Sequence, residues 1–231
     1  FASWITSLEY TSVASSVVLV TTTPLWVTLL APFFLGEKTP RIALVGLVIA
    51  LLGGFFIAIS DVCVWIPGGI NCQSTIWNLG SRALLGDALA LLGAIAGAAY
   101  LMIGRHLRRQ ISLTPYIFLV FSAAAIFLVI AMFIMDGLPP IYPDKVYGWL
   151  LLLAIVPQLL GHSIFNWSLK YLPTGYVAAN LLGEPIGSTI LAYFFLNEKP
   201  PAVKIIGAIL ILAGIGMASF RKNNPSGDDL V

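Results

Sequence analysis

The chain contains two copies of the same run of apolar segments, and this duplication limits its fold more than any other feature. Residues 1–59 align without a gap on residues 162–220 when the sequence is shifted by 161 positions. The matched pairs are Tyr10 and Tyr171, Pro24 and Pro185, Glu37 and Glu198, Gly46 and Gly207, and Gly53 and Gly214. Repeated apolar segments are typical of membrane proteins built from two related helical halves.

The composition places these segments in a lipid bilayer. Of the 231 residues, 59% are hydrophobic and 10% are charged, whereas soluble domains carry about 25% charged residues. A water-soluble protein could not cover its surface with this composition. The net charge of +2 is too small and too scattered to indicate a nucleic-acid partner. We therefore expect a multi-pass protein surrounded by the lipid bilayer of a cell membrane, with a bacterial inner membrane favoured.

Seven apolar runs are long enough to cross a membrane, for which a helix needs about 20 residues. They are residues 12–35, 42–60, 84–104, 113–135, 147–170, 174–196 and 203–220. The predicted fold class is therefore an all-α, polytopic transmembrane helix bundle. Residues 1–9 are expected to end another helix. The repeat partners of helices 84–104 and 113–135 would precede residue 1, which predicts a fragment of a protein with two halves of five helices. A genuine seven- or eight-helix protein is the alternative.

Loop charges predict the orientation of these helices. With residues 221–231 as a cytoplasmic tail, alternate loops place eight Lys and Arg residues inside and four outside, which obeys the positive-inside rule. The inside set is Lys38, Arg41, Arg105, Arg108, Arg109, Lys170, Arg221 and Lys222, and the outside set is Arg82, Lys145, Lys199 and Lys204. The basic run 105–109 then reads as a cytoplasmic loop. Because five is an odd number, the two halves should run in opposite directions across the membrane.

The longest outer loop, residues 61–83, holds both cysteines of the chain, Cys63 and Cys72. On the oxidising side of a bacterial membrane these two could form a disulfide, and two free thiols are the alternative. Their spacing lacks the partner ligands of a zinc site. The sequence predicts neither a metal site nor a cofactor.

Glu184 is the sharpest candidate for a functional residue. A carboxylate at bilayer depth costs several kcal/mol and is a site hypothesis by default. Pro185 removes a backbone donor beside it and Gly183 loosens the same turn, so a kink with exposed polar backbone is expected. The first copy keeps Pro24 but has Thr23 in place of the glutamate, so the kink belongs to both halves and the charge to one. A buried, protonated glutamate that only closes the kink is the alternative.

A second polar set lies on the helix expected over 147–170. Gln158, His162 and Asn166 step by four and should share one helical face. This stripe favours a lined cavity, in which His162 could titrate near neutral pH and exchange protons with Glu184. Ordinary hydrogen bonding between helices is the alternative. The remaining candidates for substrate binding or coupling are Asn180, Tyr100 and Trp167, and Gly93 and Gly97 form a Gly-x-x-x-Gly pair suited to close helix contact.

The charge pattern also limits the ligand. No Lys or Arg falls at the centre of a predicted span, which disfavours a small-molecule ligand that carries phosphate. One carboxylate, side-chain amides and aromatic rings suit an amine, an amphipathic cation or a zwitterion better.

These residues together resemble the EamA-type drug/metabolite transporter superfamily. The pattern runs Tyr10…Pro24…Leu35-Gly36-Glu37…Gly46…Gly53, returns as Tyr171…Glu184-Pro185…Leu196-Asn197-Glu198…Gly207…Gly214, and includes Gly86-Asp87…Gly93…Tyr100, which is similar to the start of the family's second half. The resemblance covers residues 1–222, with 1–60 as the end of the first repeat and 84–220 as the second. It implies ten helices in two inverted halves, cytoplasmic termini, and export or exchange of small metabolites, amino acids or drugs by alternating access.

Two other classes of function stay open from the sequence. A membrane scaffold or assembly partner would share the composition and carry no flux. An intramembrane enzyme is less favoured, because the chain has two histidines and no His-Glu-x-x-His pattern. No Gly-x-x-x-x-Gly-Lys-Ser/Thr loop occurs, so ATP is not expected to drive the protein directly. The substrate, the coupling ion, the direction of movement and assembly as a homodimer are left undecided by the residues.

Overall fold

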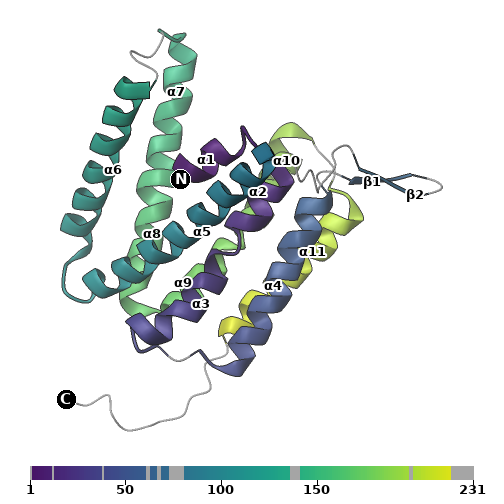
Figure 1. The fold of residues 1–231 in the computed structure, drawn as a ribbon, viewed down its shortest axis with the longest axis horizontal. Helices are drawn as coiled ribbons and strands as arrows, with labels where there is room; N and C mark the ends of the chain where they lie inside the picture. The colour runs from purple at the N-terminus through teal and green to yellow at the C-terminus, as the bar shows by residue number, and fades with distance from the viewer. Residues whose placement is uncertain are drawn as a thin grey trace. The chain divides into compact units, whose positions relative to one another are not determined.

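The computed structural model describes residues 2–11, 13–37, 39–60, 63–66, 69–72, 81–135, 141–197 and 200–219. It divides into a larger unit, Phe1–Met102 with Thr174–Val231, and a smaller unit, Ile103–Pro173. In the described residues the chain is a bundle of helices with one short hairpin (Figure 1). The predicted all-α fold class is confirmed.

Helices occupy every predicted span. The larger unit contains α1 (Ala2–Ser7), α2 (Val13–Val20), α3 (Thr23–Phe34), α4 (Arg41–Ser60), α9 (Thr174–Leu181), α10 (Glu184–Leu196) and α11 (Ala202–Ser219). Helix α5 (Ser81–Arg108) begins in the larger unit and ends in the smaller one. The smaller unit also contains α6 (Leu113–Met135), α7 (Asp144–Leu153), the π-helix η1 (Ala154–Gly161) and α8 (His162–Tyr171).

Several helices are built to lie in lipid. By length and composition, four helical stretches of the described chain could cross a membrane, namely Ser15–Phe34, Arg82–Arg108, Leu113–Ile134 and Asp144–Tyr171, and Arg41–Ile57 and Ala202–Met217 are shorter apolar helices. Large apolar side chains stay exposed on α6 and α7, for example Phe127 at 66% and Leu151 at 61%. Exposed apolar surface of this extent would be costly in water and is stable against lipid tails.

Both copies of the repeat break their helices at the same place. Helix α2 ends at Val20 and α3 begins at Thr23, and 161 positions later α9 ends at Leu181 and α10 begins at Glu184. In the first copy the hydroxyls of residues 21–23 each donate to the carbonyl three residues earlier, at 2.6–2.9 Å. These bonds satisfy carbonyls at the end of α2 that have lost their helical partners. The break is therefore a shared feature, and each copy satisfies it with different side chains.

The turns that follow α3 and α10 also match. Gly36 has a φ of 66°, and Asn197, its counterpart in the second copy, has a φ of 56°. A residue in the left-handed conformation commonly ends a helix, and asparagine is one of the few non-glycine residues that adopt it readily. The same turn thus closes both copies although the residue differs.

The most extensive helix contact in the larger unit joins α4 and α11 (Figure 1). A Cβ added to Gly53 would lie 2.5 Å from the carbonyl oxygen of Gly207, and one added to Gly207 would lie 2.7 Å from the carbonyl oxygen of Gly53. A Cβ added to Gly214 would likewise lie against the carbonyl oxygen of Gly46. The later glycine of each copy therefore faces the earlier glycine of the other. This reciprocal, antiparallel pairing is the contact that two inverted halves produce about a two-fold axis.

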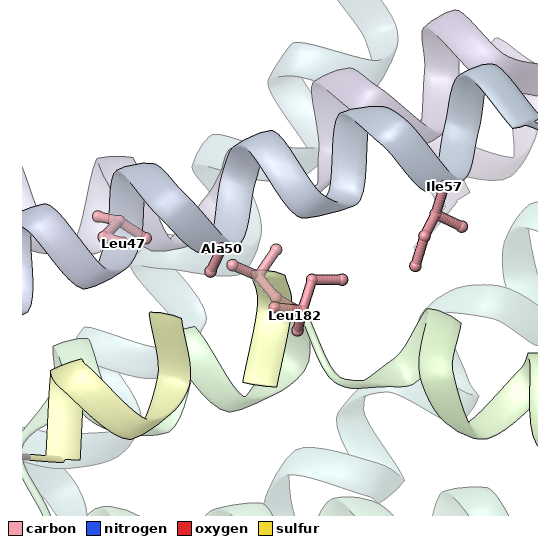
Figure 2. Close-up of a cluster of buried hydrophobic side chains, with 5 residues drawn as sticks. Leu47, Ala50, Ile57 and Leu182 are labelled. Carbon is pink, nitrogen blue, oxygen red and sulfur yellow. The ribbon is translucent and has the colours of Figure 1, made fainter. Parts of the chain in front are cut away.

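A buried apolar cluster fills the space beside this contact. Its members are Leu47, Ala50, Ile57, Leu182 and Ile211, of which the first four are labelled in Figure 2. Leu182 comes from the break between α9 and α10, and Leu25 and Ile186 pack on the cluster from equivalent positions of α3 and α10. The two broken helices are thus held against the α4–α11 pair by the same apolar cluster.

Small residues also bring α5 close to its neighbours in the larger unit. A Cβ on Gly93 would lie 3.3 Å from atoms of Ser3 and Trp4 in α1, and one on Gly97 would lie 3.4 Å from the side chain of Thr23 in α3. The close helix contact predicted for this glycine pair is therefore present.

The smaller unit shows that the basic run 105–109 was wrongly predicted as a loop. Helix α5 continues to Arg108, whose side chain is only 2% exposed. Just before it, Gly104 allows the hydroxyl of Tyr116 in α6 and the side chain of Leu169 in α8 to approach within 2.9 Å of its Cβ position. Helix α5 stays helical up to Arg108 because α6 and α8 pack against its last turns.

The outer loop predicted over 61–83 contains regular structure. Strands β1 (Cys63–Ile66) and β2 (Gly69–Cys72) form an antiparallel hairpin, and α5 begins at Ser81, before the predicted position 84. The register sets Cys63 opposite Cys72 at the open end of the hairpin. Residues opposite one another in antiparallel strands have Cα atoms about 4.5–5.5 Å apart, which lies within the range that a disulfide spans.

The register leads us to predict a Cys63–Cys72 disulfide. Protein purified without reductant should take up no maleimide until it is reduced, after which it should take up two equivalents. Cys63→Ser should expose one reactive thiol without reduction. Full labelling of unreduced, denatured protein would show that the two thiols are free.

Adjacent glycines give a matched test of the α4–α11 contact. Gly53→Ala places a methyl group against the backbone of α11, whereas a Cβ on Gly54 meets nothing within 4 Å. We expect Gly53→Ala to lower the free energy of unfolding by about 1–3 kcal/mol through overpacking, and Gly54→Ala to leave it unchanged or slightly higher, since alanine favours helix. Unfolding of the detergent-solubilised protein in a denaturant titration measures both. Equal effects from the two substitutions would contradict the close contact.

Candidate functional site

The structure divides the predicted site residues between its two units. Tyr100, Asn180 and Glu184 belong to the larger unit with the two helix breaks, and Gln158, His162, Asn166 and Trp167 belong to the smaller unit. The predicted exchange of protons between Glu184 and His162 stays a prediction.

Glu184 is the first residue of α10, and its side chain is exposed. A helix N-terminus carries unsatisfied N–H groups and a partial positive charge, which favour a carboxylate at this position. Gly183 makes the tight approach to α10 feasible, because its N–H donates to the carbonyl of Asn180 at 3.0 Å and a Cβ there would lie 3.1 Å from the same oxygen. The second break thus presents a carboxylate that is open to a ligand or a proton.

Polar groups surround the two breaks. The amide of Asn180 donates to the carbonyl of Tyr176 at 2.8 Å, and its half-buried side chain lies one turn before Glu184. In the first copy, the indole N–H of Trp26 donates to the hydroxyl of Thr22 at 3.3 Å. Carboxylate, amide, hydroxyl and aromatic groups are therefore available on α3, α9 and α10 and at the break before α3. These are the groups that bind an amine through charge, hydrogen bonds and π faces.

Tyr100 approaches the first break from α5. It is half-buried and follows Gly97 by one helical turn, and Gly97 is the residue that packs on Thr23 at the start of α3. The α5 contact thus brings an aromatic side chain toward the level at which α2 gives way to α3. The part of Tyr100 in substrate binding stays a prediction.

In the smaller unit, a π-helix interrupts the polar stripe. The N–H of His162 bonds to the carbonyl of Pro157, five residues earlier, at the end of η1. Proline removes one helical hydrogen bond and crowds the preceding turn, and a wider helix relieves this crowding. The step-of-four argument assumes an α-helix, so it does not extend from His162 back to Gln158. Accordingly, Gln158 is exposed, His162 is half-buried and Asn166 is fully buried.

Two arginines that the sequence analysis left in a loop hold the end of α8. Arg108 donates through Nε to the carbonyl of Asn166 at 3.0 Å and through Nη1 to the carbonyl of Ile111 at 2.5 Å. Arg105 donates to the carbonyl of Leu169 at 2.6 Å. The two arginines are three residues apart and so share a helix face. That spacing was the signal in the sequence that could have identified a structural role.

Glu37 links the two copies of the repeat. Its carboxylate Oε2 accepts the backbone N–H of Thr174, the first residue of α9, at 2.8 Å. Thr174 is fully buried, and the left-handed turn at Gly36 directs the chain toward it. The sequence analysis named Glu37 only as a residue matched by Glu198 in the second copy of the repeat. Its observed contact is a cap on the helix that leads to Asn180 and Glu184.

This chain is similar to known proteins in sequence and in fold. The model of the EamA-like transporter family matches residues 1–59 and 84–220. An uncharacterized transporter of Archaeoglobus fulgidus is 25% identical over 222 residues, which are 94% of this chain and 70% of the relative. The uncharacterized inner membrane transporter YhbE of Escherichia coli is 31% identical over 141 residues, 59% of this chain and 43% of the relative.

Two further comparisons extend over most of the chain. The uncharacterized transporter YxxF of Bacillus subtilis is 23% identical over 219 residues, and the match covers 64% of its length. A protein crystal structure superposes with a TM-score of 0.72 at 18% identity, covering 94% of this chain and 72% of the other. At this identity the crystal structure supports the fold alone.

Removal of the Glu37 cap should loosen α9. We expect Glu37→Gln to lower the free energy of unfolding by about 1 kcal/mol, because a neutral amide interacts less with the helix N-terminus than a carboxylate does. Hydrogen exchange at the Thr174 amide should also become faster. Glu9→Gln is the control, since Glu9 is exposed after α1. Unchanged exchange at Thr174 in Glu37→Gln would contradict the cap.

Proposed function

We propose that this chain, which belongs to the EamA-like transporter family, is part of a secondary transporter that moves a small organic solute across a membrane by alternating access. The solute class that the residues favour is an amine, an amphipathic cation or a zwitterion, including amino acids and drugs. The proposed direction is export. The protein would lie in a cell membrane, with a bacterial inner membrane favoured and its C-terminus in the cytoplasm.

The observation that carries this proposal is that both copies of the repeat have a helix break at the same position, and only one of the two breaks has a carboxylate. The breaks α2–α3 and α9–α10 fall at equivalent positions, and the starting residue is Thr23 in one and Glu184 in the other. Broken helices at the middle of a membrane are typical binding elements of secondary transporters with inverted repeats. A single carboxylate on such a frame suits a cationic solute, a proton, or both in turn.

The position of Glu184 would also couple the movement of the solute to the movement of a proton. If a cationic solute and a proton compete for Glu184, occupancy by one excludes the other, and an exchange of the two across the membrane results. His162, which begins α8 after the π-helix, is a second group that titrates near neutral pH in its ordinary state. We propose it as a partner in proton movement.

Transport in proteoliposomes is the direct test. The full-length protein that contains this chain would be purified, reconstituted and offered a panel of amino acids, amines and cationic drugs, with and without an imposed pH gradient. Accumulation that depends on the gradient supports a proton-coupled carrier, and flux that ignores it supports an exchanger or a facilitator. Folded protein that moves no member of the panel would favour the scaffold alternative over the proposed function.

Glu184→Gln tests the proposed role of the carboxylate. The substitution keeps the size of the side chain and removes its charge, so we expect gradient-dependent flux to fall by at least about tenfold, while the free energy of unfolding falls by no more than the about 0.3–1 kcal/mol that a carboxylate contributes at a helix N-terminus. Glu184→Asp, which keeps a carboxylate, should retain part of the flux. Asp144→Asn is the matched control, because Asp144 is an exposed residue at the start of α7. Wild-type flux from Glu184→Gln at every pH would refute the role.

A further inference from the structure

The broken helix of the first copy, α2–α3, is held at both ends by a carboxylate. After α3, Glu37 accepts the backbone N–H of Thr174 at the start of α9. Before α2, the hydroxyl of Thr11 donates to Oδ1 of Asp87, in the second turn of α5, at 2.7 Å. Asp87 is half-buried, and all four residues belong to the larger unit. The bond between Thr11 and Asp87 is named the Asp87 tether.

The Asp87 tether and the Glu37 cap lie at opposite ends of one membrane crossing. Between them runs Ser15–Phe34, a stretch of 20 residues that is long and apolar enough to cross a membrane and corresponds to roughly 30 Å of helix. Thr11 precedes this stretch and Glu37 follows it. The two carboxylates therefore hold α2–α3 at two different faces of the membrane, with the helix break between them.

The Asp87 tether is part of a small contact between α5 and the turn that joins α1 to α2. A Cβ on Gly86 would lie 2.7 Å from the backbone nitrogen of Thr11, so this turn rests on the backbone of α5. Cζ of Arg82 lies 5.8 Å from the centroid of the Tyr10 ring. A charge-assisted hydrogen bond and a cation–π contact thus help to hold the turn in place. Both can be released while the α4–α11 pair stays together.

Between its two ends, α2–α3 is anchored by apolar packing. Leu25, near the start of α3, packs on the buried cluster beside α4 and α11. A helix that is anchored near its middle and held by single bonds at its ends can tilt. Outward movement of the Thr11 end then presses the Glu37 end inward, and outward movement of the Glu37 end presses the Thr11 end inward.

From this arrangement we propose that Asp87 and Glu37 are positioning residues for alternating access, and that their bonds are released one at a time. The inference rests on the function proposed above and names the contacts that control it. Release of the Asp87 tether opens the helix break to one side of the membrane, and release of the Glu37 cap opens it to the other. Both bonds are formed in this structure, which is the closed state between the two.

Hydrogen exchange tests whether the two ends move in opposite senses. In the full-length protein that contains this chain, Thr11→Val keeps the shape of the side chain and removes the donor of the Asp87 tether. Exchange should become faster in peptides that cover α2 and slower in peptides that cover the start of α9, by about fivefold or more. Glu37→Gln should produce the reverse pattern. Thr6→Val, at an exposed threonine of α1, is the control and should change neither region.

A purely structural role for the two carboxylates predicts a different pattern of exchange. Each substitution would then give faster exchange near itself and no slower exchange at the other end of α2–α3. That local pattern in both variants would overturn the inference.

Labelling of the break from each side of the membrane tests the sense of opening directly. Thr21→Cys would be introduced between α2 and α3 of the full-length protein, with its other cysteines replaced by serine, and a membrane-impermeant maleimide added to one side at a time. Adding Thr11→Val should raise labelling from the side of residue 11 about fivefold or more and lower it from the other side. Adding Glu37→Gln should do the opposite. Labelling that changes equally from both sides would contradict alternate release.

The failure of this inference is distinguishable from failure of the proposed function. Solute flux in proteoliposomes without opposite effects of Thr11→Val and Glu37→Gln would overturn the role of the two bonds and leave the transporter function standing. Opposite effects in a protein that moves no solute would support the alternate release of α2–α3 and count against the transporter function.

Discussion

Backbone contact between α4 and α11 is the constraint on which the rest of the larger unit depends. Inside a bilayer, helices gain little from hiding apolar surface, so association relies on close packing and on hydrogen bonds. Gly53 and Gly207 let the two backbones approach until each carbonyl faces the other's Cα. The cluster around Leu182 and Ile57 then anchors the broken helices to this pair. A side chain at either glycine would separate α4 from α11 and withdraw the surface on which both breaks pack.

The two copies of the repeat have the same backbone features but different side chains at their helix breaks. Both copies break at equivalent residues and both close with a left-handed residue, Gly36 or Asn197. At the breaks the first copy has threonines whose hydroxyls turn back onto the carbonyls of α2, whereas the second begins α10 with Glu184. Duplication thus preserves the positions at which a helix must open, because those positions are set by packing. The side chains there are free to differ, and one of them carries a charge.

Sequence reasoning succeeded where a residue acts through its own helix. Apolar runs of sufficient length predicted the helices, Pro24 and Pro185 indicated the kinks, and the pair Gly93 and Gly97 indicated a close helix contact. It failed where the outcome depends on a distant segment. The partner of Glu37 is a backbone N–H 137 positions away, and one acceptor of the buried Arg108 is the carbonyl of Asn166 in α8, 58 positions away. The π-helix arises from the way in which the chain accommodates Pro157, which spacing alone does not specify.

The two copies meet at the α4–α11 contact and at the Glu37 cap, and these two contacts differ in the free energy needed to break them. The α4–α11 contact involves many atoms along two helices, and its parting would lose close packing along the length of both. The Glu37 cap is one hydrogen bond at a helix end, worth about 1 kcal/mol. If the protein alternates between two states, as proposed above, the lower-cost contact is the one that can be exchanged. Movement would therefore be concentrated at the ends and breaks of the α2–α3 and α9–α10 helices, while the glycine contact stays closed. This division would let the carboxylate at Glu184 change its access without loss of the fold that holds it.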